Sequence, residues 1–144
     1  MTDKLIPHKP KKRFIFITRG SAKNNRDIYN LNNYREYFLH LGFEFIKMDD
    51  KSIDEQSEII RESKLIIGLH GAAFTNLIFA NREASVLELV PKNYIDTPTA
   101  FISNALKFKW EKILLDMHPE NKEKCIINDD NINQITDWVG RTVS

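Results

Sequence analysis

Four short apolar runs alternate along this chain with segments of helical pattern, and this alternation restricts the fold more than any other feature. The runs consist largely of β-branched, aromatic and leucine residues, as expected of strands covered on both faces. They are Arg13–Thr18, Phe43–Met48, Leu65–Leu69 and Val86–Val90. Strands that alternate with helices form βαβ units, which build a doubly wound, mostly parallel sheet. The sequence therefore predicts a Rossmann-like α/β fold.

Helices are expected between the strands. Leu31, Tyr34, Phe38 and Leu41 recur at helical spacing before Gly42, a common helix stop. Ser52-Ile-Asp-Glu55 has the spacing of a capping box and precedes Ile59 and Ile60. A short helix is expected at Phe74, Leu77 and Ile78. The last third continues the alternation with a helix at 97–107, strands at 112–116 and 124–127, and a closing helix capped by Asp129 or Asp130.

Length and composition indicate one domain without a membrane span. A chain of 144 residues with 42% hydrophobic and 28% charged residues is typical of a globular domain with its own core. No apolar run approaches the ~18 residues that a spanning helix needs. The basic segment at 1–12 lacks a signal-peptide pattern. We therefore expect a leader or linker at 1–12, one domain at 13–144, and a cytoplasmic location that includes the inner membrane surface.

Charge and cysteine content favour neither a nucleic-acid partner nor a metal. Residues 1–26 hold eight Lys or Arg against one Asp, and a solvated leader is a commoner cause of such a bias than a nucleic-acid arm. Cys125 is the only cysteine and is expected to be a core residue. The acidic pairs Asp49-Asp50 and Asp129-Asp130 are typical of turns or helix starts, and Asp-x-Asp spacing is absent. We expect no bound metal.

Ligands of a doubly wound sheet bind beyond the carboxyl ends of the strands, so the turn after Leu69 is a candidate site. It reads His70-Gly71-Ala72-Ala73, with Thr75 and Asn76 just beyond. Small residues at a strand-to-helix turn let backbone amides approach an anion, which the helix N-terminus also favours. The turn is alternatively a packing feature only. His70 is either a donor to a phosphate oxygen or a hydrogen-bonded neighbour of the core.

Three charged residues belong to the same edge of the predicted sheet. Arg19 and Arg26 follow the first strand, and guanidinium groups bind phosphate through paired hydrogen bonds. Solvated loop arginines are the alternative. Glu88 lies inside an apolar strand, where an unpaired carboxylate is costly. It therefore needs donors, which either a ribose or a buried salt bridge would supply.

The ordered set of these motifs resembles glycosyltransferase family 61 over roughly residues 13–115. The matching residues are Arg19, Arg26-x-x-x-Asn30, Gly42-Phe43, Ser52 with Glu55-Gln56, His70-Gly71-Ala72, Thr75-Asn76-Leu77 and Val86-Leu87-Glu88-Leu89. The sequence departs from the family pattern at Leu31, where Glu is usual, and at Ala73, where Gly is common. These departures affect the sugar or acceptor specificity that we expect.

The resemblance implies an inverting, metal-independent transferase of the two-domain GT-B type, in a family that includes proteins linked to capsular polysaccharide synthesis. It implies a nucleotide-sugar substrate, expected to be a UDP-sugar, and a glycan acceptor held by an N-terminal domain for which this chain has no room. Catalytic roles fall on His70 and Arg19; substrate binding falls on Arg26, Asn30, Gly71, Ala72, Thr75, Asn76 and Glu88. No cofactor is expected. The alternative is a non-catalytic module that binds a nucleotide or a protein.

The other enzyme classes lack their motifs. His-Gly-Ala-Ala is similar to the oxyanion loop of esterases, but the chain has no Gly-x-Ser-x-Gly nucleophile elbow. It also has no Walker lysine motif and no Gly-x-Gly-x-x-Gly. A hydrolase, a nucleoside triphosphatase and a dehydrogenase are therefore disfavoured.

Overall fold

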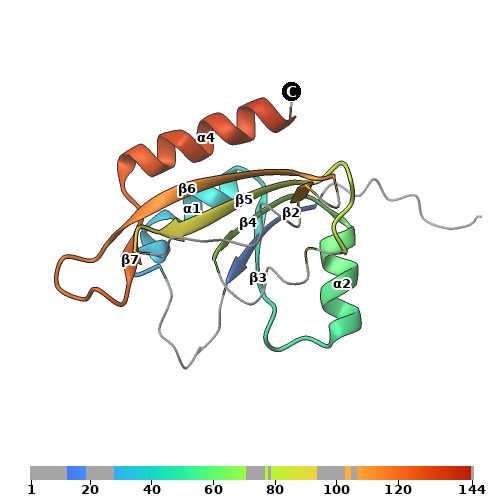
Figure 1. Cartoon of the computed structure of the whole chain (residues 1–144), viewed down its shortest axis with the longest axis horizontal. Helices are drawn as coiled ribbons and strands as arrows, with labels where there is room; N and C mark the ends of the chain where they lie inside the picture. Colours follow the sequence, from blue (N-terminus) through green and yellow to red (C-terminus); the bar gives the residue numbers. More distant parts are fainter. Residues whose placement is uncertain are drawn as a thin grey trace, which may run out of the picture.

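The fold is centred on a six-stranded sheet (Figure 1). The structure is a computed structural model that describes residues 13–18, 28–70, 77, 79–93, 103–104 and 107–143. The strands are β2 (Arg13–Thr18), β3 (Phe43–Lys47), β4 (Ser63–Leu69), β5 (Ser85–Pro91), β6 (Lys109–Met117) and β7 (Cys125–Ile126). The first five are parallel, and β7 runs antiparallel to β6. The prediction of a mostly parallel α/β sheet is therefore confirmed.

The strand order is β3-β2-β4-β5-β6-β7. Counted along the chain, the five parallel strands follow the order 2-1-3-4-5 of flavodoxin-like sheets, whereas the Rossmann order is 3-2-1-4-5-6. The chain leaves β2 toward one edge of the sheet and leaves β4 toward the other edge. This change of direction creates a topological switch point between the carboxyl ends of β2 and β4, where doubly wound sheets bind ligands.

Helices cover both faces of the sheet. In Figure 1, α1 (Arg35–His40) and α4 (Asp129–Val143) lie on one side, and α2 (Ile53–Arg61) lies on the other. Phe38, Ile135 and Trp138 pack into one buried cluster beneath α1 and α4. Ile60 of α2 belongs to a separate cluster on the opposite face. The alternating side chains of the central strands thus enter two cores, as a sheet covered on both faces requires.

The first predicted helix ends before Gly42, and the second begins after Ser52, as the sequence predicts. The short 3-10 helix η1 (Leu31–Tyr34) leads into α1, and Gly42 follows with φ of 96°, a conformation that glycine adopts without strain. At the start of α2, the Ser52 side chain accepts a hydrogen bond from Glu55 N, and the Glu55 side chain accepts one from Ser52 N. Both halves of the predicted capping box are therefore confirmed.

The start of α4 differs from the prediction by one residue. Asp129 and Asp130 are helical, and the cap is Asn128, whose Oδ1 accepts a hydrogen bond of 2.8 Å from Asn131 N. Asn131 Oδ1 in turn accepts one of 3.0 Å from Asn128 N. An asparagine three residues into the helix takes the role that Glu or Gln has in a capping box. Asn131 is buried, which makes this exchange part of the core.

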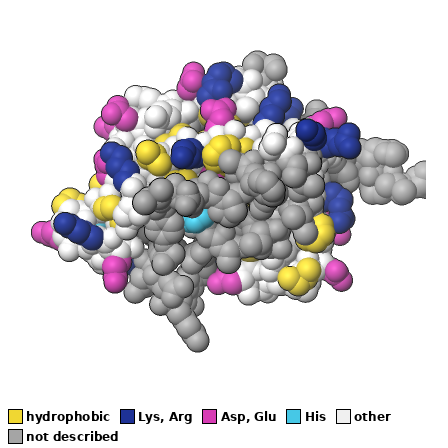
Figure 2. Space-filling model, in the orientation of Figure 1, with side chains coloured by type: hydrophobic (Ala, Val, Ile, Leu, Met, Phe, Trp, Pro, Cys, Tyr) yellow, Lys and Arg dark blue, Asp and Glu magenta, His cyan; other side chains and the backbone are white. Residues whose placement is uncertain are grey.

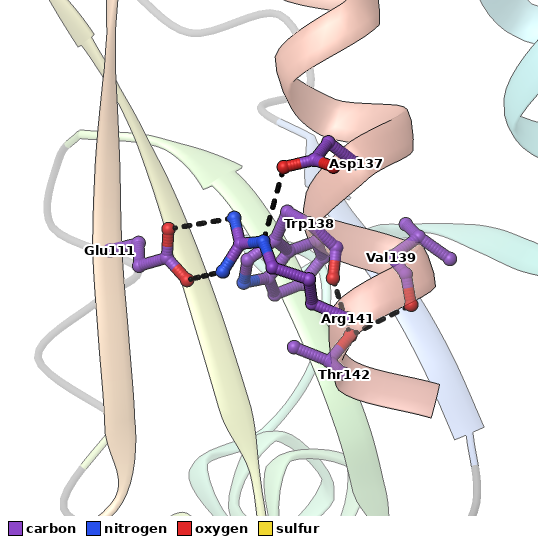
Figure 3. A network of polar contacts seen from close by, with 6 residues as sticks. All are labelled: Glu111, Asp137, Trp138, Val139, Arg141 and Thr142. Atoms are coloured by element: carbon purple, nitrogen blue, oxygen red, sulfur yellow. Dashed lines mark hydrogen bonds and ion pairs between the residues drawn. The ribbon is translucent and has the colours of Figure 1, made fainter. Parts of the chain in front are cut away.

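The other end of α4 is attached to β6 by an arginine (Figure 3). Arg141 contacts both oxygens of Glu111 at 2.9 and 3.2 Å, and its Nε lies 3.1 Å from Asp137 Oδ2. These hydrogen bonds raise the pKa of Arg141. The fork of the guanidinium matches the carboxylate and so fixes the direction of the helix across the sheet.

Several predicted elements differ in extent or lie outside the described residues. Strand β6 begins three residues before the expected 112–116 because Lys109–Glu111 continue the pairing with β5. Strand β7 is shorter than expected. The leader 1–12 and most of the helices expected at 74–78 and 97–107 lie outside the described residues. Cys125 is a core residue, as predicted.

Charged side chains of both signs lie on the described surface (Figure 2). Figure 2 shows basic and acidic side chains interspersed around the described part of one face. No helix within the described residues is long and apolar enough to cross a membrane.

Candidate functional site

A buried carboxylate lies between two hydrogen-bonding side chains from the neighbouring strands. Glu88, in β5, has no exposed surface. Its Oε2 lies 2.6 Å from Nδ1 of His70, just past the end of β4, and its Oε1 accepts a hydrogen bond of 3.0 Å from Trp110 Nε1 in β6. Both carboxylate oxygens are therefore engaged, which offsets the cost of burying the group.

The strand register places these three side chains on one face of the sheet. Gly68 is the partner of Glu88, and Val86 is the partner of Trp110. Because residues two apart in a strand share a face, His70 follows Gly68 on the face that carries Glu88. Gly68 has no side chain to occupy the space beside the carboxylate. The backbone N–H of His70 donates to Leu89 O at 2.8 Å, which extends the parallel ladder to the imidazole.

The hydrogen bond to Glu88 fixes the orientation of the His70 ring. An ionised carboxylate only accepts hydrogen bonds, so Nδ1 of His70 carries the proton in this contact. The His70 side chain is 16% exposed and stands at the carboxyl edge of the sheet. With Nδ1 bound to Glu88, Nε2 is the nitrogen left for a ligand, and in the imidazolium form of the ring it donates to an anion at this edge.

The structure brings together two of the residues that the sequence analysis selects. His70 and Glu88 are in direct contact. Burial of Glu88 requires hydrogen-bond partners, and His70 and Trp110 are two of them. A contact between Glu88 and a ribose stays a prediction. The other selected residues at this edge lie outside the described residues, so their roles also stay predictions: Arg19, Arg26, Gly71, Ala72, Thr75 and Asn76.

Asn30 is engaged by the backbone of a distant segment. Its Nδ2 donates to Ile127 O at 2.8 Å, and its Oδ1 accepts from Ile127 N at 2.9 Å. The preceding residue, Tyr29, donates from its backbone N–H to Cys125 O at 2.8 Å. These bonds attach the segment before η1 to β7. The role of Asn30 in substrate binding stays a prediction.

A cavity of about 360 Å³ lies at the switch point of the sheet. Thr18 ends β2, Lys47 ends β3 and Leu69 ends β4, and all three residues line it. Its remaining lining residues come from the strand interior, from the segment at 28–35 and from the start of β7: Phe16, Ile17, Ile28, Tyr29, Leu31, Asn32, Arg35 and Lys124. Leu69 directly precedes His70, and because side chains alternate along a strand, the cavity and the His70–Glu88 pair lie at the same carboxyl edge but on opposite faces of the sheet.

The charged residues that line this cavity, within the described part of the chain, are all basic: Arg35, Lys47 and Lys124. None of them forms an ion pair with a described carboxylate. The guanidinium carbon of Arg35 lies 4.4 Å from the centroid of the Phe45 ring, and Lys124 Nζ lies 5.9 Å from that of Tyr29. Two of the three cations therefore lie within cation–π distance of an aromatic ring, and neither has a carboxylate partner in the described part of the chain.

A second hollow, of about 320 Å³, lies at the amino end of β2 and has the opposite charge character. Its lining includes Asp54, Glu55, Glu58 and Glu62, together with Arg13. Arg13 contacts Glu44 at 2.9 Å and Glu62 at 3.0 Å. The hydrogen bonds that Arg13 donates to these two carboxylates, Glu44 first, raise the pKa of Arg13.

Sequence reasoning missed Trp110 and the three cations of the cavity. Trp110 was assigned to no element, because the predicted strand began at Lys112. The donor requirement of a buried Glu88 was the signal that pointed to a nearby N–H group. Lys47 was detectable as the last residue of a strand beside β2, whereas Lys124 reaches the cavity through long-range pairing that no local pattern reveals.

Comparison with known proteins gives a family and a fold. The sequence model described as Glycosyltransferase 61 matches residues 2–87, a segment that includes His70 and ends one residue before Glu88. A crystal structure of a diflavin flavoprotein A3 from Nostoc sp. is similar, with a TM-score of 0.55 and 11% identity over 91% of this chain and 94% of that chain. At that identity the likeness shows the fold alone. No curated protein matches the sequence.

Proposed function

Since the chain belongs to the glycosyltransferase 61 family, we propose that it is the donor-binding domain of a glycosyltransferase. The enzyme transfers a sugar from a nucleoside diphosphate sugar, a UDP-sugar, to a glycan acceptor in polysaccharide biosynthesis. The observation that carries this proposal is the hydrogen bond between His70 and the fully buried Glu88 at the carboxyl edge of the sheet. That edge is where doubly wound sheets bind nucleotides.

In this proposal, His70 stabilises the negative charge that develops on the leaving diphosphate. Glu88 acts through His70 as a positioning residue, because it fixes the plane of the imidazole, and Trp110 fixes the carboxylate. A donor that is already oriented needs no reorganisation during the reaction. Removal of one such donor typically reduces kcat by about 10²–10³-fold.

The loops next to His70 supply the remaining donor contacts in this proposal. Arg19 and Arg26 bind diphosphate oxygens, and backbone amides at Gly71 and Ala72 approach the same group. Thr75 and Asn76 orient the sugar. These assignments follow from the family resemblance and from the position of the loops after β2 and β4.

The reaction is a direct displacement with inversion at the anomeric carbon. The acceptor hydroxyl attacks that carbon, its proton passes to a general base, and the bond to the diphosphate oxygen breaks. We assign the acceptor site and the general base to a second domain of GT-B type. A general base typically contributes about 10²–10⁴ in rate, so this chain alone should bind donor without efficient turnover.

Calorimetry with UDP and UDP-glucose tests the proposal. We expect His70→Ala to weaken UDP binding by about tenfold or more, as the loss of a charge-assisted hydrogen bond implies. Glu88→Gln should weaken it less, because the amide still contacts His70. His40→Ala is the matched control, since His40 is exposed at the end of α1.

Two results would contradict the proposal. Wild-type chain that gives no heat and no competition at millimolar UDP lacks the donor site. If His70→Ala and His40→Ala bind UDP with equal affinity, His70 does not belong to the donor site. That result would favour a module that binds another partner.

A further inference from the structure

The cavity at the switch point gathers three basic side chains that have no ion-pair partner within the described residues. Arg35, Lys47 and Lys124 come from α1, β3 and the segment before β7, so three distant parts of the chain contribute one cation each. No described carboxylate pairs with any of them. Like charges around one hollow repel each other, and this repulsion is relieved when an anion binds there.

The remaining lining of the cavity suits a flat ring. Leu31 and Leu69 contribute apolar side chains, and Tyr29 stands at the rim with 59% of its surface exposed. The Tyr29 ring packs edge-on against His118, with centroids 4.3 Å apart, while its backbone is bonded to Cys125. An exposed aromatic ring next to a cation offers a stacking surface for a nucleobase beside a site for its phosphate.

We infer that this cavity is the nucleoside monophosphate subsite of the donor: Lys47, Lys124 and Arg35 bind the phosphate next to the ribose, and Tyr29 stacks on the base. The inference rests on the proposed function and extends it: the diphosphate crosses the carboxyl edge of the sheet, from the face of the cavity residue Leu69 to the opposite face, where the outer phosphate meets His70. The cavity volume of about 360 Å³ falls within the usual range of small-molecule sites, roughly 300–1,000 Å³.

Binding of UMP and UDP to the 144-residue chain tests the subsite. The double variant Lys47→Gln, Lys124→Gln should raise the Kd of both nucleotides by about tenfold or more, because each carries the inner phosphate. His70→Ala should raise the Kd of UDP more than that of UMP. Tyr29→Ala should weaken UMP by about 5- to 150-fold and pyrophosphate much less, since stacking contributes about 1–3 kcal/mol per base and pyrophosphate has no base.

A matched control separates specific contacts from net charge. The double variant Lys109→Gln, Lys122→Gln changes charge by the same amount at two exposed lysines that do not line the cavity. It should bind both nucleotides as the wild type does. Arg35 is left intact because its guanidinium also packs on Phe45, so its loss changes packing as well as charge.

The outcomes distinguish this inference from the proposed function. If UDP binds with dependence on His70 but equally to both double variants, the subsite is wrong and the donor-binding function stands. If neither nucleotide binds but pyrophosphate binds with dependence on Lys47 and Lys124, the cavity is an anion site and the nucleotide-sugar function fails. If none of the three ligands binds, both proposals are overturned.

Discussion

The two ends of strand β2 carry opposite arrangements of charge. At the amino end, Arg13 is held between Glu44 and Glu62 beside an acidic hollow. At the carboxyl end, Lys47 and two further cations line a cavity with no described acidic partner. Paired charges at one end support the fold, and the charges at the other end, which have no partner among the residues that the structure describes, are the ones that we assign to a ligand. The predictions below test this division of roles.

The largest effect on stability is expected from Asn30→Ala. This change leaves the backbone N–H and C=O of buried Ile127 without their partner, at a cost of about 1–3 kcal/mol for each group. Urea unfolding measures the loss. Asn33→Ala, at an exposed position of η1, is the control. Equal stability of the two variants would show that the attachment of the segment before η1 to β7 does not depend on Asn30.

Arg13→Met is expected to cost less, about 1 kcal/mol, because its ion pairs are partly exposed. The loss should shrink in 1 M NaCl, where the Debye length falls to about 3 Å. UDP affinity should not change. Arg82→Met, at an exposed turn position, provides the comparison. A variant of Arg13 that weakens UDP binding would break the division between the two ends of the strand.

Lys47→Gln should leave the free energy of unfolding within about 0.5 kcal/mol of the wild type, as for an exposed residue with no ion pair to any described carboxylate. A slight gain is also compatible, since repulsion around the cavity is reduced. Urea unfolding in the absence of ligand measures the effect. A loss as large as that of Arg13→Met would mean that Lys47 is a structural residue.

The smallest effect concerns the pH dependence of the α2 cap. The hydrogen bond from the Ser52 backbone, followed by that from its side chain, lowers the pKa of Glu55 from its ordinary 4.5. The folded state therefore gains stability above pH 4.5 and loses it as the pH falls through the lowered value. Glu55→Gln should lower Tm slightly at pH 7, and the difference should vanish in strong acid. A difference that persists there would contradict this assignment.

The sequence was sufficient for the elements that are encoded locally. The capping box of Ser52 and Glu55 and the strand Arg13–Thr18 were predicted with the correct boundaries, because adjacent residues determine both. His70 and Glu88 were selected because a polar residue in or after an apolar strand is costly unless it has a partner.

The rest depends on strand order and on pairing over long distances. No local pattern tells that β2 lies between β3 and β4, which is what creates the switch point. Trp110 and Lys124 contribute to their sites only through register with β5 and through the attachment of β7. The cap of α4 was misplaced because Asp129 and Asp130 are also good caps, and only the observed bonds identify Asn128.

The attachment of Asn30 to Ile127 joins residues 97 positions apart in the sequence. Bringing together residues so far apart in the chain costs conformational entropy. The hydrogen bonds offset this cost only once they have formed. The segment at 124–127, which includes Lys124, is therefore expected to pack against the segment before η1 late in folding. During synthesis on the ribosome, the ligand cavity cannot be complete until the residues through Ile127 have emerged.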